Sequence, residues 1–204
     1  MSKRQISTLW DAADYANHLN RPLSTFITLV WQFVGINDQT KADKAFAAFT
    51  AKLRPWLIAK TGGYYAVWVA ENSPDRGYHH HLLAHAPREI TPKLREAAKA
   101  WLPKRRHPQK AHALDIRLPW VNANPIKAQY GQLRYISKAM DYSAEMVDRE
   151  TGEVFNLASW LGVKPKEGKA LTGLVLGKRC GASESLGALI RSHAEFPSRF
   201  ECFA

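Results

Sequence analysis

Apolar residues at strand and helix spacings divide most of the chain into short elements. Four runs rich in β-branched and aromatic residues predict strands at 24–35, 64–71, 79–86 and 111–120. Apolar positions three and four residues apart predict helices at 38–60, 91–102 and 126–147. The order strand, helix, two strands, helix, strand, helix predicts an α+β fold of the split β-α-β type, with an antiparallel central sheet flanked by helices.

The segments on either side of this pattern are predicted to be accessory. Residues 1–20 hold a short amphipathic helical pattern and are expected to form an N-terminal extension, whereas 21–147 form the main domain. Residues 148–204 are expected to form a C-terminal tail whose role the sequence leaves open. Within this tail, the basic stretch 162–169 predicts a linker, and 183–193 predicts a short capped helix.

The charge balance favours a polyanionic partner. The chain has 29 Lys and Arg residues against 18 Asp and Glu, a net charge of +11, which indicates nucleic acid first and an anionic membrane surface second. No apolar run has the length needed to span a membrane, and the N-terminus lacks the apolar core of a signal peptide. Cys180 and Cys202 match no paired metal-binding spacing and form no disulfide framework. We therefore expect a cytoplasmic protein without a membrane partner.

Candidate chemistry is concentrated in the third predicted strand, where four of the chain's eight histidines fall within seven consecutive positions. Because alternate side chains of a strand share a face, His79 and His81 form an adjacent pair, and His80 is expected to pack on the other face. The preceding turn brings Glu71 close to His79, although the sequence leaves open on which face Glu71 lies. Two imidazoles and one carboxylate are typical of a site for a divalent cation, here Mn²⁺ or Mg²⁺. The alternative is a strand face on which these side chains only form hydrogen bonds.

Other histidine chemistries fit the sequence less well. A histidine-triad hydrolase requires a third alternating histidine, but that position is Leu83. His81 and His85 have the spacing of a zincin helix, but Leu82 stands where the catalytic glutamate would be. A structural zinc site requires cysteine partners, and none lies near in sequence. His85 lies too far along the strand for the same ion and is expected to be structural or to face a substrate.

The predicted helix over 126–147 presents a tyrosine beside a lysine. The apolar stripe expected to face the sheet consists of Ile126, Tyr130, Leu133, Ile136 or Ser137, and Met140. Tyr135, Lys138 and Tyr142 lie on a neighbouring face at spacings of three and four. Next to a metal site, Tyr135 could attack a phosphodiester while Lys138 holds a phosphate or offsets phenolate charge. In the alternative, Tyr135 is a packing residue and Lys138 is solvated.

Three stretches resemble the motifs of a known family, in the expected order. FITLVW (26–31) resembles the first, strand-forming motif of the HUH endonucleases, the rolling-circle replication initiators (Rep) of bacterial plasmids and single-stranded DNA phages. HHHLLAHAP (79–87) resembles their His-hydrophobic-His motif, with His80 where a hydrophobic residue is usual, and Glu71 stands where many members place a third metal ligand. YISK (135–138) resembles the Tyr-x-x-Lys motif of the single-tyrosine members.

The resemblance spans residues 22–145 and implies an RRM-like or ferredoxin-like HUH nuclease domain. The metal ligands that it implies are Glu71, His79 and His81. It implies a site-specific nickase in which Tyr135, assisted by Lys138, attacks single-stranded DNA at a replication origin, stays joined to the 5′ end and leaves a free 3′ hydroxyl. The chain is too short to include a helicase domain, so a host helicase and a host polymerase are expected partners.

The DNA contacts and the exact biological role are less constrained. The expected phosphate contacts are Arg105, Arg106, Lys110 and Arg134. A transposase or conjugative relaxase would use the same chemistry on different DNA. A non-catalytic nucleic-acid-binding module would bind without the site residues, and a metal-dependent phosphoesterase would cleave with Tyr135 passive.

Overall fold

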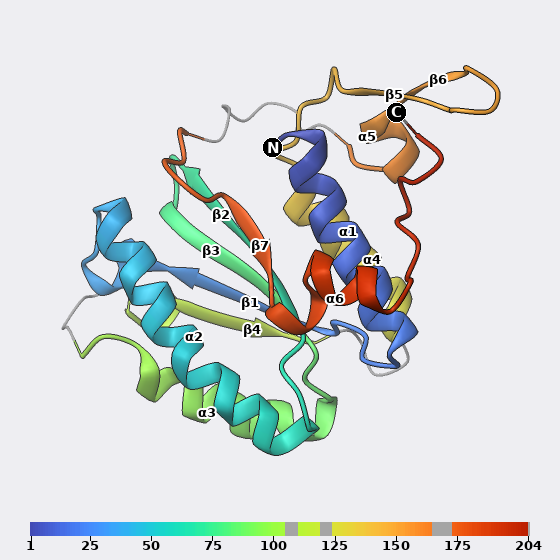
Figure 1. Cartoon of the computed structure of the whole chain (residues 1–204). Coiled ribbons are helices and arrows are strands. Elements are labelled where there is room, and N and C mark those ends of the chain that lie inside the picture. The colour runs from blue at the N-terminus through green and yellow to red at the C-terminus, as the bar shows by residue number, and fades with distance from the viewer. Residues whose placement is uncertain (105–109, 119–123, 165–172, 204) are drawn as a thin grey trace.

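A five-stranded antiparallel sheet forms the centre of the protein (Figure 1). The structure is a computed structural model, and it describes residues 1–104, 110–118, 124–164 and 173–203. The strands are β1 (Thr25–Val30), β2 (Ala66–Ser73), β3 (Gly77–Ala84), β4 (Leu114–Arg117), β5 (Glu145–Val147), β6 (Val154–Asn156) and β7 (Cys180–Ala182). The α-helices are α1 (Lys3–His18), α2 (Gln39–Thr61), α3 (Thr91–Trp101), α4 (Pro125–Ser137), α5 (Leu157–Leu161) and α6 (Ala188–His193).

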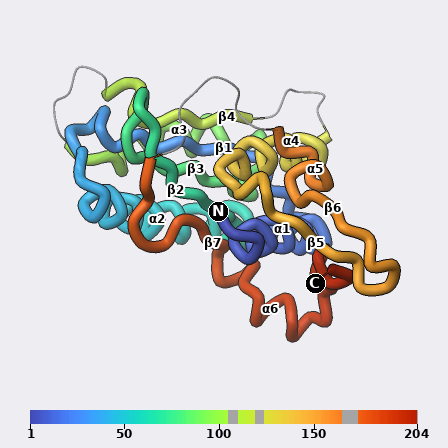
Figure 2. Tube along the Cα trace, turned by 90° about the horizontal axis from the view of Figure 1, so that it is seen from above, coloured from blue at the N-terminus to red at the C-terminus, as the bar shows by residue number. Residues whose placement is uncertain are grey.

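The strands follow one another in the order β4-β1-β3-β2-β7, and each pairs antiparallel with its neighbours. Figure 2 shows this succession from above, with β7 at one edge beside α1. β5 and β6 form a separate hairpin. The predicted α+β class, with an antiparallel sheet flanked by helices, is confirmed.

Helices cover both faces of the sheet (Figure 1). On one face, α2 and α3 pack against the side chains of Ile27, Leu29 and Leu82 in one buried apolar cluster. On the other face, α1 and α4 enclose a second cluster that includes Phe26 and Leu83. Apolar side chains that alternate along the central strands therefore pack into two different cores, as expected for a sheet buried on both sides.

The N-terminal segment, predicted as an extension over 1–20, packs into the core. A capping box between Ser2 and Gln5 starts α1, whose Ile6, Leu9 and Trp10 are almost fully buried. α1 packs against β7 and α4. Because its apolar stripe covers part of one face of the sheet, removal of this helix would expose part of the core.

The C-terminal segment is likewise part of the architecture. β7, which lies within the region predicted as a tail, pairs with β2 through Val67↔Ala182 and Val69↔Cys180. The predicted helix at 183–193 is divided into a 3-10 turn (Glu184–Leu186) and α6. The predicted linker at 162–169 lies mostly outside the described residues. Tail residues thus complete one edge of the central sheet.

The helix predicted over 126–147 ends ten residues early, at Ser137. The Asp141 side chain accepts hydrogen bonds from the backbone N–H and the hydroxyl of Ser143, which favours a turn over a further helical turn. Of the predicted apolar stripe, Leu133 is buried, but Ile126 is 42% exposed. The early end leaves Lys138 at the helix terminus.

Strand boundaries also differ from the prediction. The strand expected over 24–35 ends at Val30, where a 3-10 turn (Trp31–Val34) is closed by Gly35 in the left-handed conformation. The strand expected over 111–120 covers only Leu114–Arg117. In the described part of the chain, no helix combines the length and the apolar character that crossing a membrane requires.

Candidate metal centre

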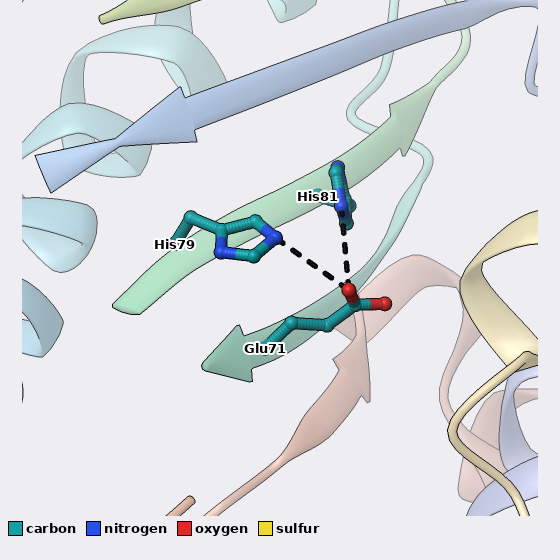
Figure 3. A group of neighbouring side chains, drawn as sticks. All are labelled: Glu71, His79 and His81. Atoms are coloured by element: carbon teal, nitrogen blue, oxygen red, sulfur yellow. Dashed lines mark ion pairs between the residues drawn. The ribbon is translucent and has the colours of Figure 1, made fainter. Parts of the chain in front are cut away.

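The β2–β3 hairpin brings the three expected metal ligands onto one face of the sheet. Glu71 lies directly opposite His79 in the antiparallel ladder, and Val69 lies opposite His81. Directly paired residues share a face, so the position of Glu71 that the sequence left open is settled. The three side chains point toward the same space from two neighbouring strands (Figure 3).

The geometry of this group suits a single cation. Oε2 of Glu71 lies 3.5 Å from Nε2 of His79 and 3.8 Å from Nε2 of His81. One ligand atom from each residue lies within 4.8 Å of the others, and all three residues are buried. Within the described residues, neither Oε1 of Glu71 nor Nε2 of His81 has a hydrogen-bond partner. Buried polar atoms without partners are costly, and a bound cation would satisfy both.

The protonation states also match those of metal ligands. Burial alone would raise the pKa of Glu71, but its contact with His79 and the nearby Lys138 ammonium lower this pKa to about 2. Burial lowers the pKa of His81 to about 3. At neutral pH the site therefore presents an ionised carboxylate and a neutral imidazole, the forms that bind a metal.

Tyr135 and Lys138 lie at the rim of this group. The ammonium nitrogen of Lys138 is 3.0 Å from Oε2 of Glu71 and 3.8 Å from the centre of the Tyr135 ring. The Tyr135 ring meets the His81 ring edge-on, with 5.5 Å between centroids. Tyr135 is 44% exposed, so its hydroxyl-bearing ring is accessible from solvent. The structure thus brings together all five residues predicted for metal binding and catalysis.

The sequence of α4 explains how Tyr135 and Lys138 reach this position. The Asn124 side chain accepts hydrogen bonds from the first backbone N–H groups of the helix, which starts at Pro125. Ile136 and Ser137 are fully buried, and the Ser137 hydroxyl accepts a hydrogen bond from the Trp10 indole. Because Ile136 faces the core, the preceding Tyr135 lies at the edge of the packed surface.

The other two histidines of the cluster have structural contacts. His80 lies on the opposite face, stacked on Phe46 at 4.0 Å, and its Nδ1 accepts a hydrogen bond from the Trp31 indole. Burial lowers the pKa of His80 to about 3. The expectation that His80 packs behind the sheet is confirmed. Nδ1 of His85 is 2.9 Å from the carbonyl oxygen of Pro22, which indicates a structural role.

The expected DNA contacts are only partly placed. Arg105 and Arg106 lie outside the described residues. Lys110 begins a short 3-10 turn beside β4. Arg134 is exposed on α4, and its Nε donates a hydrogen bond to the carbonyl of Leu161. The phosphate-binding role of these residues stays a prediction.

Sequence reasoning missed two residues that contact His81 from β1. The Phe26 ring stacks on the His81 ring, with 5.1 Å between centroids and 19° between planes. Thr28 lies directly opposite His81, and its Oγ1 is 3.0 Å from Nδ1 of His81. The alternation Phe26, Thr28 within FITLVW was an available signal, since these residues share a strand face, but the partner strand could not be assigned from sequence.

Comparison with protein-family models, with curated proteins and with solved structures finds no match to this chain. The metal centre is therefore argued from its own geometry and chemistry. A buried Glu/His/His group that could hold a metal ion, with Tyr135 and Lys138 beside it, is what the structure establishes.

Proposed function

We propose that this protein is a metal-dependent, site-specific nickase and strand transferase that acts on single-stranded DNA and initiates rolling-circle replication. The observation that carries the proposal is the placement of a solvent-accessible tyrosine and its lysine against a buried Glu/His/His group. The resemblance to HUH endonucleases supports it, because those motifs lie on the elements that converge here. The proposal includes the finer fold type, an RRM-like or ferredoxin-like HUH nuclease domain.

The metal would be Mg²⁺ or Mn²⁺. The residues that would hold it are Glu71, His79 and His81. When bound, it supplies a positive charge that polarises a phosphodiester and stabilises negative charge in the transition state. The carboxylate and the two imidazole nitrogens fit either ion, and imidazole ligands favour Mn²⁺ over Mg²⁺.

Tyr135 would act as the nucleophile. Its phenolic oxygen forms a bond to phosphorus while the bond between phosphorus and the 3′ oxygen breaks, which gives a 5′-phosphotyrosine. The phenolic proton leaves to solvent, and the departing 3′ oxygen takes up a proton to become a free 3′ hydroxyl. The Lys138 ammonium, 3.8 Å from the ring centre, would offset the negative charge that develops on the phenolic oxygen during this attack. The phosphotyrosine conserves the ester bond, so the strand can be rejoined later.

The proposed setting is the cytoplasm, with a replication origin as substrate and a host helicase and polymerase as partners. The net charge of +11 suits a DNA backbone. A transposase or relaxase would use the same site on different DNA. Oligonucleotides tiled across the replicon distinguish these roles, because a replication initiator would cleave the origin sequence.

The test is formation of a covalent adduct. Single-stranded oligonucleotides tiled across the replicon that encodes the protein are incubated with the protein and Mn²⁺, then resolved on a denaturing protein gel. We expect a slower-migrating adduct with the wild type, none with Tyr135→Phe or His81→Ala, and an unchanged adduct with the control Tyr142→Phe. Cleavage without an adduct, unchanged in Tyr135→Phe, would indicate a phosphoesterase. Binding without cleavage of any oligonucleotide would indicate a non-catalytic module.

A further inference from the structure

We infer that Thr28 is a positioning residue of the metal centre, which fixes the tautomer and the orientation of the His81 ring. The inference rests on the metal site of the proposed function but not on its tyrosine chemistry. Thr28 belongs to β1, which supplies none of the three ligands. Because β1 and β2 flank β3 on opposite sides, Thr28 contacts His81 from the side away from Glu71.

Contacts on both sides of the His81 ring define the arrangement. Nε2 lies 3.8 Å from Oε2 of Glu71 and has no hydrogen-bond partner among the described residues. Nδ1 lies 3.0 Å from Oγ1 of Thr28. Thr28 is 3% exposed and His81 is 1% exposed, so water does not compete for this contact. Nε2 therefore faces the other ligands, and Nδ1 faces Thr28.

The tautomer follows from the needs of a ligand. A neutral imidazole carries one N–H and one lone pair, and only the nitrogen with the lone pair can bind a metal. If Nε2 of His81 is the ligand atom, Nδ1 carries the hydrogen and donates it to Oγ1 of Thr28. Partners of this kind on the second nitrogen orient metal-binding histidines and raise their basicity.

His79 shows the same arrangement with a different partner. Its Nδ1 is 2.8 Å from the carbonyl oxygen of Gly77, and a carbonyl can only accept a hydrogen bond. Nδ1 of His79 therefore carries a hydrogen, and Nε2 is directed toward Oε2 of Glu71 at 3.5 Å. Thr28 performs for His81 the role that the Gly77 carbonyl performs for His79.

Packing alone does not fix the His81 ring. The stacked Phe26 ring holds the plane of the imidazole. A rotation of 180° about the Cβ–Cγ bond of His81 keeps the ring in that plane but exchanges Nδ1 with a carbon atom. Among the described residues, the Thr28 hydroxyl is the hydrogen-bond partner of the His81 ring, so this contact favours the orientation in which Nδ1 faces β1. Loss of the hydroxyl would therefore leave the ring in place but reduce the fraction of molecules with Nε2 correctly presented.

The test compares three variants by calorimetric titration with Mn²⁺, without DNA. Thr28→Val preserves the shape of the side chain and removes its oxygen, and we expect it to weaken Mn²⁺ binding by about 10- to 100-fold. Thr28→Ser restores the oxygen and should bind within a few-fold of wild type. The matched control is Thr25→Val, since Thr25 is a fully buried threonine of the same strand whose hydroxyl donates to the carbonyl of Ala86. This control should bind Mn²⁺ as the wild type does.

Unfolding temperatures measured without metal separate positioning from folding. Should Thr28→Val fail to fold, Thr28→Ala offers the same comparison with a smaller side chain. Wild-type affinity in Thr28→Val, or equal weakening in Thr28→Ser, would overturn the inference. A wild-type protein that does not bind Mn²⁺ would overturn both the metal centre and the role of Thr28. Weakened binding in Thr28→Val, together with absence of any DNA adduct in the wild type, would remove the nickase proposal and keep Thr28 as a positioning residue.

Discussion

Lys138 and Glu71 form an ion pair inside the candidate metal centre, with the ammonium nitrogen 3.0 Å from Oε2 of the carboxylate. Nε2 of His79 and Nε2 of His81 lie close to the same oxygen. The Lys138 side chain is only 12% exposed, so its charge is poorly screened. Lys138 therefore lies where it can affect both the metal and Tyr135.

Replacement of Lys138 should separate metal binding from catalysis. In Lys138→Met, loss of a neighbouring positive charge should tighten Mn²⁺ binding by roughly tenfold, because the cation no longer shares Glu71 with the ammonium group. Adduct formation should nevertheless fall, since the attacking oxygen of Tyr135 loses its cationic neighbour. Titration calorimetry and the gel assay measure the two effects. The control Lys127→Met removes an equal charge from an exposed position on α4, and equal effects of both changes would refute a specific role for Lys138.

Metal removal should lower the stability of the wild type but not that of a ligand variant. A ligand at one hundred times its dissociation constant stabilises a folded protein by about 2.7 kcal/mol. Mn²⁺ should therefore raise the unfolding temperature of the wild type, and EDTA should reverse the increase. Glu71→Gln should show no such shift, whereas Glu184→Gln, which alters an exposed ion pair with Arg54, should behave as the wild type does. A Mn²⁺-dependent shift in Glu71→Gln would show that the ion binds elsewhere.

Burial of His80 should make the fold sensitive to mild acid. The pKa of His80 falls from an ordinary 6.5 to about 3 in the folded state, so below pH 6.5 the unfolded chain binds a proton that the folded chain does not. The stability contributed by neutral His80 is complete above pH 6.5 and is lost as the pH falls toward 3.

Urea unfolding at pH 7.5 and pH 5.0 measures this effect. Between pH 7.5 and pH 5.0, the free energy of unfolding of His80→Phe should fall by roughly 2 kcal/mol less than that of the wild type. Loss of the Trp31 partner lowers the stability of this variant at both pH values. The exposed His112 provides the control, because His112→Gln should lose as much as the wild type. An unchanged pH dependence in His80→Phe would contradict the assignment.

Arg199 should contribute measurably to stability through its contacts with α1. Its Nε and Nη2 donate to the two carboxylate oxygens of Asp14, each at 2.7 Å, and the guanidinium lies over the rings of Trp10 and Tyr130. Arg199→Met should lower the free energy of unfolding by about 1–3 kcal/mol, and Arg199→Lys should not restore it, because an ammonium cannot reproduce the paired hydrogen bonds.

An exposed ion pair provides the control for Arg199. Arg117 pairs with Asp115 at the surface of β4, and Arg117→Met should change stability by less than about 0.5 kcal/mol. Urea unfolding measures both variants. Comparable effects in Arg199→Met and Arg117→Met would show that the C-terminal segment is not held to α1 by this pair.

The sequence predicted which residues lie together at the candidate metal centre better than it predicted the C-terminal strand β7 or the end of α4. Strand alternation and a tight turn are local properties, so the hairpin that brings Glu71 close to His79 could be inferred from spacing, whereas the register that places both on one face could not. The apolar stripe of their helix placed Tyr135 and Lys138 on the neighbouring face, and the resemblance of YISK to the Tyr-x-x-Lys motif suggested their roles. The local signals at the site agree with the tertiary structure.

Most of the features that the sequence did not predict depend on contacts between distant residues. β7 has three residues, too few for a recognisable pattern, and it exists because Val67 and Val69 offer an edge with which Cys180–Ala182 pairs. The early end of α4 results from competition by a side-chain turn at Asp141, which periodicity alone does not reveal. Thr28 was missed because the pairing of β1 with β3 is a property of the sheet, not of either strand.

Mass spectrometry of the trypsin-digested protein–DNA adduct tests the central claim most directly. Trypsin cleaves after Arg134 and Lys138, so Tyr135 lies in the four-residue peptide 135–138 and Tyr142 lies in the peptide 139–149. After nuclease treatment of the DNA, a nucleotide attached to 135–138 is the result we expect. A nucleotide attached to 139–149, or cleaved DNA without any modified peptide, would contradict the role of Tyr135 as the nucleophile.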